Sequence, residues 1–273
     1  MSVLFGLYQP EAGQIRKNGK EVAIRNPNDA NALGIGMVHQ HFKLVECFSV
    51  LDNIILGVEP NKMGFLQKAE ARKKVMALSE KYGLRVDPDA LISDISVGMQ
   101  QRVEILKMLY RDNEILIFDE PTAVLTPQEI DELMEIMRGF KKEGKSILFI
   151  THDLGTVANM CDNVAVMYLG KIVEMSDAET IYQSPKHAYT KALLDAIPEP
   201  DPSRANKHQP LPGDVPSPIN PPLGSAFGHR IQHPSYPETV GADLTPVEIE
   251  PGHWVAPDPC ALEPEDWNRI RQR

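Results

Sequence analysis

The sequence contains few cysteines, no long apolar run and no excess of basic residues. Its three cysteines, Cys47, Cys161 and Cys260, are too far apart for a disulfide framework or a cysteine metal site, which indicates a reducing, cytoplasmic environment. No apolar run reaches the roughly 18–20 residues that a membrane-spanning helix requires. The formal charge of −10 and the isoelectric point near 5.3 argue against a nucleic-acid partner.

Proline is scarce in the first two-thirds of the chain and frequent after it. Only 7 of the 23 prolines precede residue 190, and the other 16 lie between Pro198 and Pro264. We therefore predict an α/β domain over residues 1–197 and a proline-rich extension over residues 198–273. So much proline disfavours regular helices and central strands, so we expect the extension to consist of loops and short edge strands.

Apolar runs alternate with amphipathic segments over residues 1–197, as they do in α/β domains. We expect strands at residues 32–40, 114–120 and 146–153, and a β-hairpin over residues 163–176 that turns at Gly170 and Lys171. We expect helices at residues 49–57, 66–83, 97–111 and 126–144. Gly83 is predicted to cap the second of these helices, and Pro127 to stand in the first turn of the last.

The segment ILIFDEPTAVLTP, residues 115–127, ends an apolar strand in two adjacent acids, Asp119 and Glu120. A buried parallel strand delivers such acids to the carboxyl edge of a sheet, which is where ligands bind in open α/β folds. In that interpretation Asp119 holds Mg²⁺ and Glu120 activates the water that attacks a γ-phosphate. The alternative is a strand that simply ends in two exposed acids.

Four other residues suit the same chemistry. Gln40 ends a strand, where its side-chain amide can reach a metal ion or the attacking water. Ser96 and Gly98 stand just before a helix, and a small hydroxyl, a glycine and a helix N-terminus together suit an anion. His152 ends another strand, where an imidazole can reach a γ-phosphate. Taken singly, each also has an ordinary structural role as a loop residue, a helix cap or a hydrogen-bonded histidine.

The segments VHQ, ISVGMQQRVEI, ILIFDEPTA and LFITHD occur in this order over about 115 residues. With this set the sequence resembles the ATP-binding subunit of ABC transporters over essentially its whole length. The resemblance implies an α/β fold, a truncated P-loop NTPase-like ABC ATPase core with a helical subdomain at about residues 41–112. It implies the following roles: Gln40 as the Q-loop glutamine and, with Asp119, a Mg²⁺ ligand; Ser96 and Gly98 as signature-motif contacts to ATP; Asp119 as the Walker B aspartate; Glu120 as the catalytic glutamate; His152 as the switch histidine.

Three features depart from the family pattern. The signature motif, commonly LSGGQ, reads ISVGM at residues 95–99, and the loop after Walker B ends in LT at residues 125–126 where the family commonly has LD. The pattern G-x-x-x-x-G-K-[ST] occurs only at residues 139–146, GFKKEGKS, where a predicted helix runs into a predicted strand. A phosphate loop stands instead between a strand and a helix, so this match is not one. The opening MSVLFGLYQPEAGQI resembles the helix that follows that loop. We therefore expect the loop to lie upstream of Met1, the chain alone to bind ATP negligibly, and neighbouring strands to face an unpaired gap.

The two ends of the chain resemble different branches of the family. Up to about His152, segments such as GMVHQHFKLVECFSVLDNIILG are similar to nucleoside or simple-sugar importers. From Asp153, segments such as GTVANMCDNVAVMYLGKIVE are similar to oligopeptide and dipeptide importers. The join falls in FITHDL, and either a fusion or one divergent lineage accounts for it. Many peptide-importer tails carry cysteines proposed to hold an iron–sulfur cluster; Ser225 and Ile231 stand at such positions here, so we expect no cluster.

The resemblance implies the ATP-binding subunit of an importer that couples ATP hydrolysis to solute uptake and uses ATP and Mg²⁺. We expect the peptide or dipeptide class, because the extension is the longest distinctive segment. The alternative is a nucleoside or simple-sugar importer, which residues 41–61, expected to dock the permease, favour. A further alternative is a catalytically inactive subunit that donates its signature motif to an intact partner. A soluble ABC protein of translation or repair fits less well, since such proteins usually carry two domains or a basic surface.

Expected partners are a second ABC ATPase subunit, identical or different, an integral membrane permease and, indirectly, a solute-binding protein. The expected location is the cytoplasmic face of the inner or plasma membrane, as a peripheral subunit.

Overall fold

The computed structural model describes residues 1–62, 64–158, 160–197 and 211–272. It forms two compact units, Met1–His152 and Asp153–Arg273. The chain divides between His152 and Asp153, inside FITHDL, the segment in which the two resemblances join. The domain boundary expected at residues 197/198 borders residues outside the described ranges. Within the described ranges, no helix is long and apolar enough to cross a membrane.

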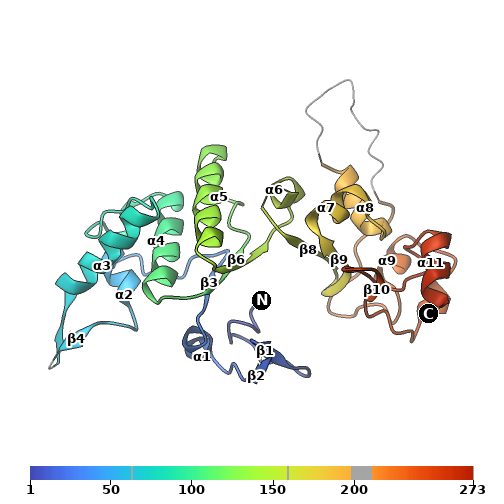
Figure 1. The fold of residues 1–273 in the computed structure, drawn as a ribbon, viewed down its shortest axis with the longest axis horizontal. Helices are drawn as coiled ribbons and strands as arrows, with labels where there is room; N and C mark the ends of the chain where they lie inside the picture. The colour runs from blue at the N-terminus through green and yellow to red at the C-terminus, as the bar shows by residue number, and fades with distance from the viewer. Residues whose placement is uncertain (63, 159, 198–210, 273) are drawn as a thin grey trace. The chain divides into compact units, whose positions relative to one another are not determined.

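The first unit is built on a parallel sheet of three strands in the order β3-β6-β7 (Figure 1). These strands span Ile35–Val38, Ile115–Asp119 and Ser146–Ile150, so all three predicted strands are confirmed. β6 pairs with a neighbour on each edge, and its residues Leu116, Ile117 and Phe118 are fully buried. This central position explains why the segment is a continuous apolar run that ends in acids.

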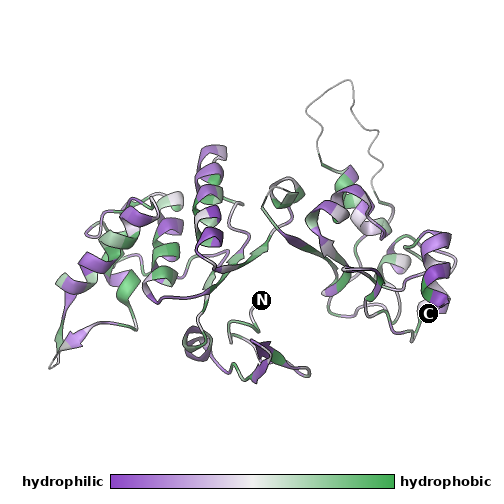
Figure 2. Ribbon diagram, viewed as in Figure 1, coloured by the Kyte–Doolittle hydropathy of each residue, from purple (hydrophilic) through white to green (hydrophobic). Residues whose placement is uncertain are grey.

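The predicted helices of the first unit are confirmed with slightly narrower bounds: α2 (Val50–Ile55), α3 (Lys68–Lys81), α4 (Val97–Tyr110) and α5 (Pro127–Lys142). The unit also contains α1 (Pro27–Ala32), a 3₁₀ turn (Ile92–Asp94) and two short ribbons, β1 (Ile15–Lys17) with β2 (Lys20–Val22) and β4 (Asn61–Lys62) with β5 (Phe65–Leu66). Helices α2, α3 and α4 pack together, while α1 and α4 cover β3 and α5 packs on β7. Figure 2 shows the central strands mostly green and α5 largely purple, as expected for a surface helix against an apolar sheet.

Local signals account for where these helices begin and end. Thr126 and Glu129 form a reciprocal capping box at the start of α5, and Pro127 occupies its first turn, where a missing N–H costs nothing. α3 ends at Lys81, and Gly83 follows with φ +67°, the left-handed conformation that glycine adopts without strain. The opening residues differ from expectation: they form turns rather than a helix, with Phe5 buried against Ile24 and Met37.

β7 is the last strand of its sheet in the part of the chain that the structure describes. Its apolar residues Ile147, Leu148, Phe149 and Ile150 are all only partly buried, in contrast to the fully buried centre of β6. An apolar strand with one unpaired edge pairs readily with other chains.

We predict that Ser146→Lys reduces self-association of the chain. Ser146 is exposed at the start of β7, so a lysine there adds a charge to the open edge without removing a core contact. Light scattering over a concentration series measures the effect. Gln128→Lys, on the exposed start of α5, is the control because it changes the net charge equally. Equal association of the two variants would rule out the β7 edge as the cause.

The second unit contains a four-stranded antiparallel sheet in the order β10-β11-β9-β8. Its elements are α6 (Leu154–Ala158), β8 (Asn163–Tyr168), β9 (Lys171–Asp177), α7 (Ala178–Gln183), α8 (Ala188–Asp195), α9 (Ala226–Arg230), α10 (Tyr236–Thr239), β10 (Val247–Glu250), β11 (His253–Val255) and α11 (Pro264–Arg271). The hairpin predicted over residues 163–176 is confirmed as β8 and β9, with Gly170 at the turn at φ +77°.

The prediction that the extension lacks regular helices and central strands is wrong. α11 is a regular helix whose only proline, Pro264, stands in the first turn, where proline is tolerated. β11 contains no proline and lies between β10 and β9, so it is an interior strand. Proline content therefore misled the prediction because the prolines of the described residues fall between the elements or in the first turn of a helix.

A buried carboxylate ties the extension to the residues before it. Glu174 on β9 is fully buried and accepts hydrogen bonds from His253 Nε2 on β11 at 2.8 Å and from the backbone N–H groups of Lys186 at 2.7 Å and His187 at 3.0 Å. Burial alone would raise the pKa of Glu174, but these hydrogen bonds lower it, so the carboxylate is ionised and fully engaged. Because these bonds link residues on both sides of residue 197, the compact unit begins well before that position.

Candidate functional site

Three of the residues singled out in the sequence meet at the carboxyl edge of the β3-β6-β7 sheet. Gln40 Nε2 donates to Glu120 Oε2 at 3.4 Å, and His152 Nδ1 lies 3.3 Å from Glu120 Oε1. The three residues follow three different strands, and parallel pairing brings the ends of those strands together. We call Gln40, Glu120 and His152 the carboxyl-edge cluster. The side chain of His152 is 78% exposed and that of Glu120 is 28% exposed, so a ligand can reach both.

The backbone around Glu120 is held in an unusual conformation. Glu120 has φ +47°, a left-handed conformation that is costly for a residue with a Cβ and that clusters at functional sites. Its N–H donates to the Ile150 carbonyl of β7 at 2.9 Å. The carbonyl of the next residue, Pro121, accepts from Gln101 Nε2 of α4 at 2.8 Å. Contacts from two neighbouring elements therefore fix the direction in which the Glu120 side chain points.

Asp119 ends β6 directly before Glu120 and pairs with Ile150 across the sheet. Its charge also acts on His39: burial lowers the pKa of His39, Lys43 lowers it further, and Asp119 raises it. Asp119 ends β6 and Gln40 follows the paired strand β3, and the two offer carboxylate and amide oxygens, the ligand types that Mg²⁺ prefers. The donor set therefore fits the Mg²⁺ that the sequence interpretation assigns to these two residues.

Ser96 and Gly98 lie at the N-terminus of α4. Ser96 is the N-cap residue, and its Oγ accepts from the Met99 N–H at 3.3 Å. Gly98 is buried, and a Cβ built on it would lie 2.1 Å from Glu129 Oε1 of the α5 capping box. Among the contacts of the described residues, none joins this pair to the carboxyl-edge cluster. The structure therefore brings together three of the six candidate residues, Gln40, Glu120 and His152. Asp119 directly precedes Glu120 in the chain, and Ser96 and Gly98 lie at the start of α4.

We predict a strong coupling between Gly98 and Glu129. In Gly98→Ala the new methyl group displaces Glu129 and weakens a capping box worth about 0.5–2 kcal/mol, which offsets the roughly 0.8–1 kcal/mol that alanine adds to a helix. In a Glu129→Ala background the same substitution should stabilise the chain. Urea denaturation of the two single variants and the double variant measures the coupling free energy. Strictly additive effects would show that Glu129 does not limit the space at Gly98.

Sequence reasoning missed Gln101. It is 3% exposed, and its hydrogen bond to Pro121 links the helix that carries Ser96 and Gly98 to the loop that carries Glu120. The available signal was a glutamine on the same face of α4 as buried apolar residues such as Ile105, since a buried amide needs a hydrogen-bond partner.

A family model described as ABC transporter matches residues 1–123, and one described as Oligopeptide/dipeptide transporter, C-terminal region, matches residues 173–233. The chain carries an ABC transporter ATP-binding domain. The residues matched by the ABC model include Gln40, Ser96, Gly98, Asp119 and Glu120, and the second model matches within the other compact unit. The sequence resemblance to the family is thereby confirmed, including the match of its C-terminal part to the peptide-importer tail.

Similar curated proteins are import ATP-binding proteins. Guanosine import ATP-binding protein NupO of Bacillus subtilis is 57% identical over 183 residues, which cover 67% of this chain and 36% of that protein. Nucleoside import ATP-binding protein NupA of Lactococcus lactis is 56% identical over 174 residues, which cover 64% of this chain and 34% of that protein. This chain thus spans about a third of the length of the curated relatives it matches.

Solved structures of ABC ATP-binding proteins share the fold. CbiO1 of Clostridium perfringens, described as part of an ABC transporter complex, aligns with a TM-score of 0.57 and 28% identity over 67% of this chain and 73% of that chain. An ATP-binding cassette of an ABC transporter in its ADP conformation aligns with a TM-score of 0.57 and 22% identity, which bears on the fold alone. The predicted fold class, an α/β ABC ATPase core of the P-loop NTPase type, is confirmed.

Proposed function

We propose that this chain is the ATP-binding subunit of an ABC importer of nucleosides or simple sugars, acting with a second ATP-binding subunit and a permease. The observation that carries the proposal is the carboxyl-edge cluster, in which Gln40 and His152 hold both oxygens of Glu120. ABC relatives that import guanosine, nucleosides and ribose support the importer class. On this proposal the subunit lies on the cytoplasmic face of the membrane, held there by the permease.

Glu120 is proposed as the general base for water attack on the γ-phosphate. Its carboxylate points from a strained, doubly anchored backbone, so little reorganisation is needed to aim it at a water molecule. Gln40 orients the Glu120 oxygen that it contacts, and His152 places a second polar group beside the other oxygen. Mg²⁺, when bound, neutralises phosphate charge, and Asp119 and Gln40 are the residues proposed to hold it.

Ser96 and Gly98 are proposed to contact the γ-phosphate of ATP held by the partner subunit. In this family two subunits pair head to tail, so the signature motif of one meets the phosphate loop of the other. The position of Ser96 at the N-terminus of the 14-residue helix α4 supports this role, since helix N-termini favour anions. Met99 stands where the family commonly has glutamine, so Ser96 and Gly98 are the motif residues proposed to make the contact.

Nucleosides or simple sugars now rank ahead of peptides as the proposed substrate class. The sequence interpretation placed peptides first because of the extension, and the match of residues 173–233 to the peptide-importer C-terminal region still favours them. However, the relatives that align over about two-thirds of the chain import guanosine, nucleosides or ribose. Residues 41–61, proposed to dock the permease, belong to the part that resembles those importers.

Co-purification with permeases tests the substrate class. A tagged chain should retain a nucleoside-importer permease in detergent extracts and release a dipeptide-importer permease. Phe48→Glu, on an exposed side chain within residues 41–61, should weaken retention, whereas Phe65→Glu, on an exposed side chain outside that segment, should not. Retention of the dipeptide-importer permease instead would return the peptide class to first place, and retention of neither would remove the proposal of permease docking.

A further inference from the structure

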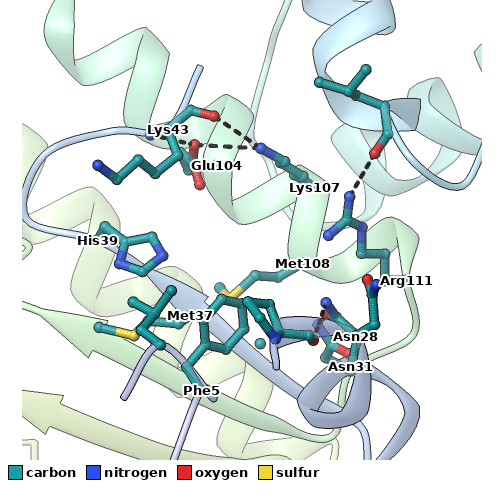
Figure 3. Close-up of a pocket in the computed structure, with 15 residues that line it drawn as sticks. Phe5, Asn28, Asn31, Met37, His39, Lys43, Glu104, Lys107, Met108 and Arg111 are labelled. Carbon is teal, nitrogen blue, oxygen red and sulfur yellow. Dashed lines mark hydrogen bonds and ion pairs between the residues drawn. The ribbon is translucent and has the colours of Figure 1, made fainter. Parts of the chain in front are cut away.

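The first unit contains a cavity of about 370 Å³ that the proposed ATP chemistry does not use (Figure 3). It is lined by the opening residues, α1, β3 and α4, and none of Gln40, Glu120 and His152 lines it. Its volume falls in the range of roughly 300–1,000 Å³ that is typical of small-molecule sites. The cavity therefore has room for a ligand of its own.

One side of the cavity is apolar. Figure 3 shows Phe5, Met37 and Met108 on the same side of the open space, with His39 beside them. The rings of Phe5 and His39 meet edge to face, with centroids 5.5 Å apart. Aromatic rings and methionine sulfur pack well against flat ring systems, so this side suits an aromatic or heteroaromatic group.

The opposite side is rich in positive charge. Lys43, Lys107 and Arg111 line it together with a single carboxylate, Glu104. Glu104 Oε1 already accepts from the Lys43 backbone N–H at 3.1 Å and lies 3.8 Å from Lys107 Nζ. The lining thus contributes three cationic side chains and one carboxylate, an excess of positive charge, although Glu59 outside the lining also acts on Arg111.

The hydrogen bonding of these cations leaves donor capacity free. Arg111 donates from Nη2 to the Leu56 carbonyl at 2.8 Å, but its buried Nε finds no partner among the described residues. Burial lowers the pKa of Lys107, Glu104 raises it and the charge of Arg111 lowers it further. Burial also lowers the pKa of Arg111, whereas the charges of Glu104 and Glu59 raise it. An anion in the cavity would offset this cost and accept the unused hydrogen bonds.

We propose that this cavity binds a small amphipathic anion, a flat ring system that carries one phosphate or carboxylate group. The ring lies against Phe5, Met37 and His39, and the anionic group faces Lys43, Lys107 and Arg111. Because His39 directly precedes Gln40, an occupied cavity restrains the backbone from which the Gln40 side chain reaches Glu120. Lys43 lies within residues 41–61, which are also proposed to dock the permease, so binding is measured on the isolated chain, where neither ATP hydrolysis nor transport takes part.

Isothermal calorimetry on the full chain tests the proposal with phenyl phosphate as the probe. Inorganic phosphate supplies the charge without the ring, and benzyl alcohol supplies a ring without the charge. Phenyl phosphate should bind at one site, at least about tenfold more tightly than either, since each part adds free energy of its own. Affinity equal to that of inorganic phosphate, or no saturable binding at millimolar probe, would overturn the proposal.

Two variants locate the binding. Lys43→Met removes one cation and should weaken phenyl phosphate binding by roughly tenfold, the effect of one charge-assisted contact. Lys73→Met, on an exposed lysine of α3 outside the cavity, is the matched control and should bind as the parent chain does. Leu7→Trp leaves every charge in place but fills the cavity mouth from a half-exposed position, and should abolish phenyl phosphate binding. If Lys73→Met weakens binding as much as Lys43→Met, or if Leu7→Trp leaves binding unchanged, the cavity is not the site.

Discussion

The purified 273-residue chain is expected to bind Mg·ATP at least about a thousandfold more weakly than an ABC ATP-binding domain that has its phosphate loop. The one G-x-x-x-x-G-K-[ST] match in the sequence, residues 139–146, lies where α5 ends and β7 begins. A phosphate loop stands between a strand and a helix, so this match does not supply the backbone N–H groups and lysine that hold the β- and γ-phosphates. Each hydrogen bond to a charged phosphate contributes roughly 1.5–3 kcal/mol, so the lack of about three or four costs some 5–10 kcal/mol. That corresponds to about 10³–10⁷ in affinity.

Fluorescent-nucleotide titration measures this affinity, with circular dichroism to show that the chain is folded. The carboxyl-edge cluster supplies only Gln40, Glu120 and His152 toward a nucleotide, and Glu120 is an acid that does not attract phosphate in the absence of Mg²⁺. Micromolar binding that Asp119→Asn abolishes would contradict the expectation and reveal a phosphate site built from other residues.

The second large effect is expected on the ATPase rate of an intact ATP-binding domain that pairs with this chain. Addition of this chain should raise the ATPase rate of an intact ATP-binding domain of the nucleoside-importer class, because Ser96 and Gly98 are proposed to complete the partner's ATP site. Ser96→Asp should abolish the increase. Aspartate caps a helix as well as serine does, so α4 keeps its N-cap, but the new carboxylate faces the γ-phosphate.

The rate is measured with a phosphate-release assay over a titration of the chain. Ser96→Thr keeps both the cap and the hydroxyl and should retain most of the increase, whereas the loss of a hydrogen bond to phosphate in Ser96→Ala should reduce it by roughly 10- to 150-fold. Ser93→Ala, three residues upstream on an exposed side chain, is the control. An increase that survives Ser96→Asp would show that stimulation does not pass through the signature motif.

Much of the first unit could be predicted from its sequence because its signals are local. The apolar run from Ile115 to Phe118 predicts the central strand, and the Thr126 cap with Pro127 predicts the start of α5. The meeting of Gln40, Glu120 and His152 was also predictable, since each follows a strand of a parallel sheet and such strands end at one edge.

The features that sequence reasoning missed depend on contacts between distant residues. The bond from Gln101 to Pro121 and the close approach of Gly98 to Glu129 join segments about 20 to 31 residues apart, and no periodicity reports them. The extension was misjudged for a similar reason: β11 becomes an interior strand only because β9 pairs with it, and buried Glu174 fixes that pairing through His253. Composition describes such a segment poorly when its prolines lie between elements or in the first turn of a helix.

The central claim is that this chain pairs with an intact ATP-binding domain through Ser96 and Gly98. The most direct test is multi-angle light scattering of the chain mixed with an intact domain in which the catalytic glutamate is replaced by glutamine, so that bound ATP is retained. We expect a complex of one chain with one intact domain that forms with Mg·ATP, is absent with ADP and is lost in Ser96→Asp. A complex that forms equally well without nucleotide, or none with the unsubstituted chain, would contradict the claim.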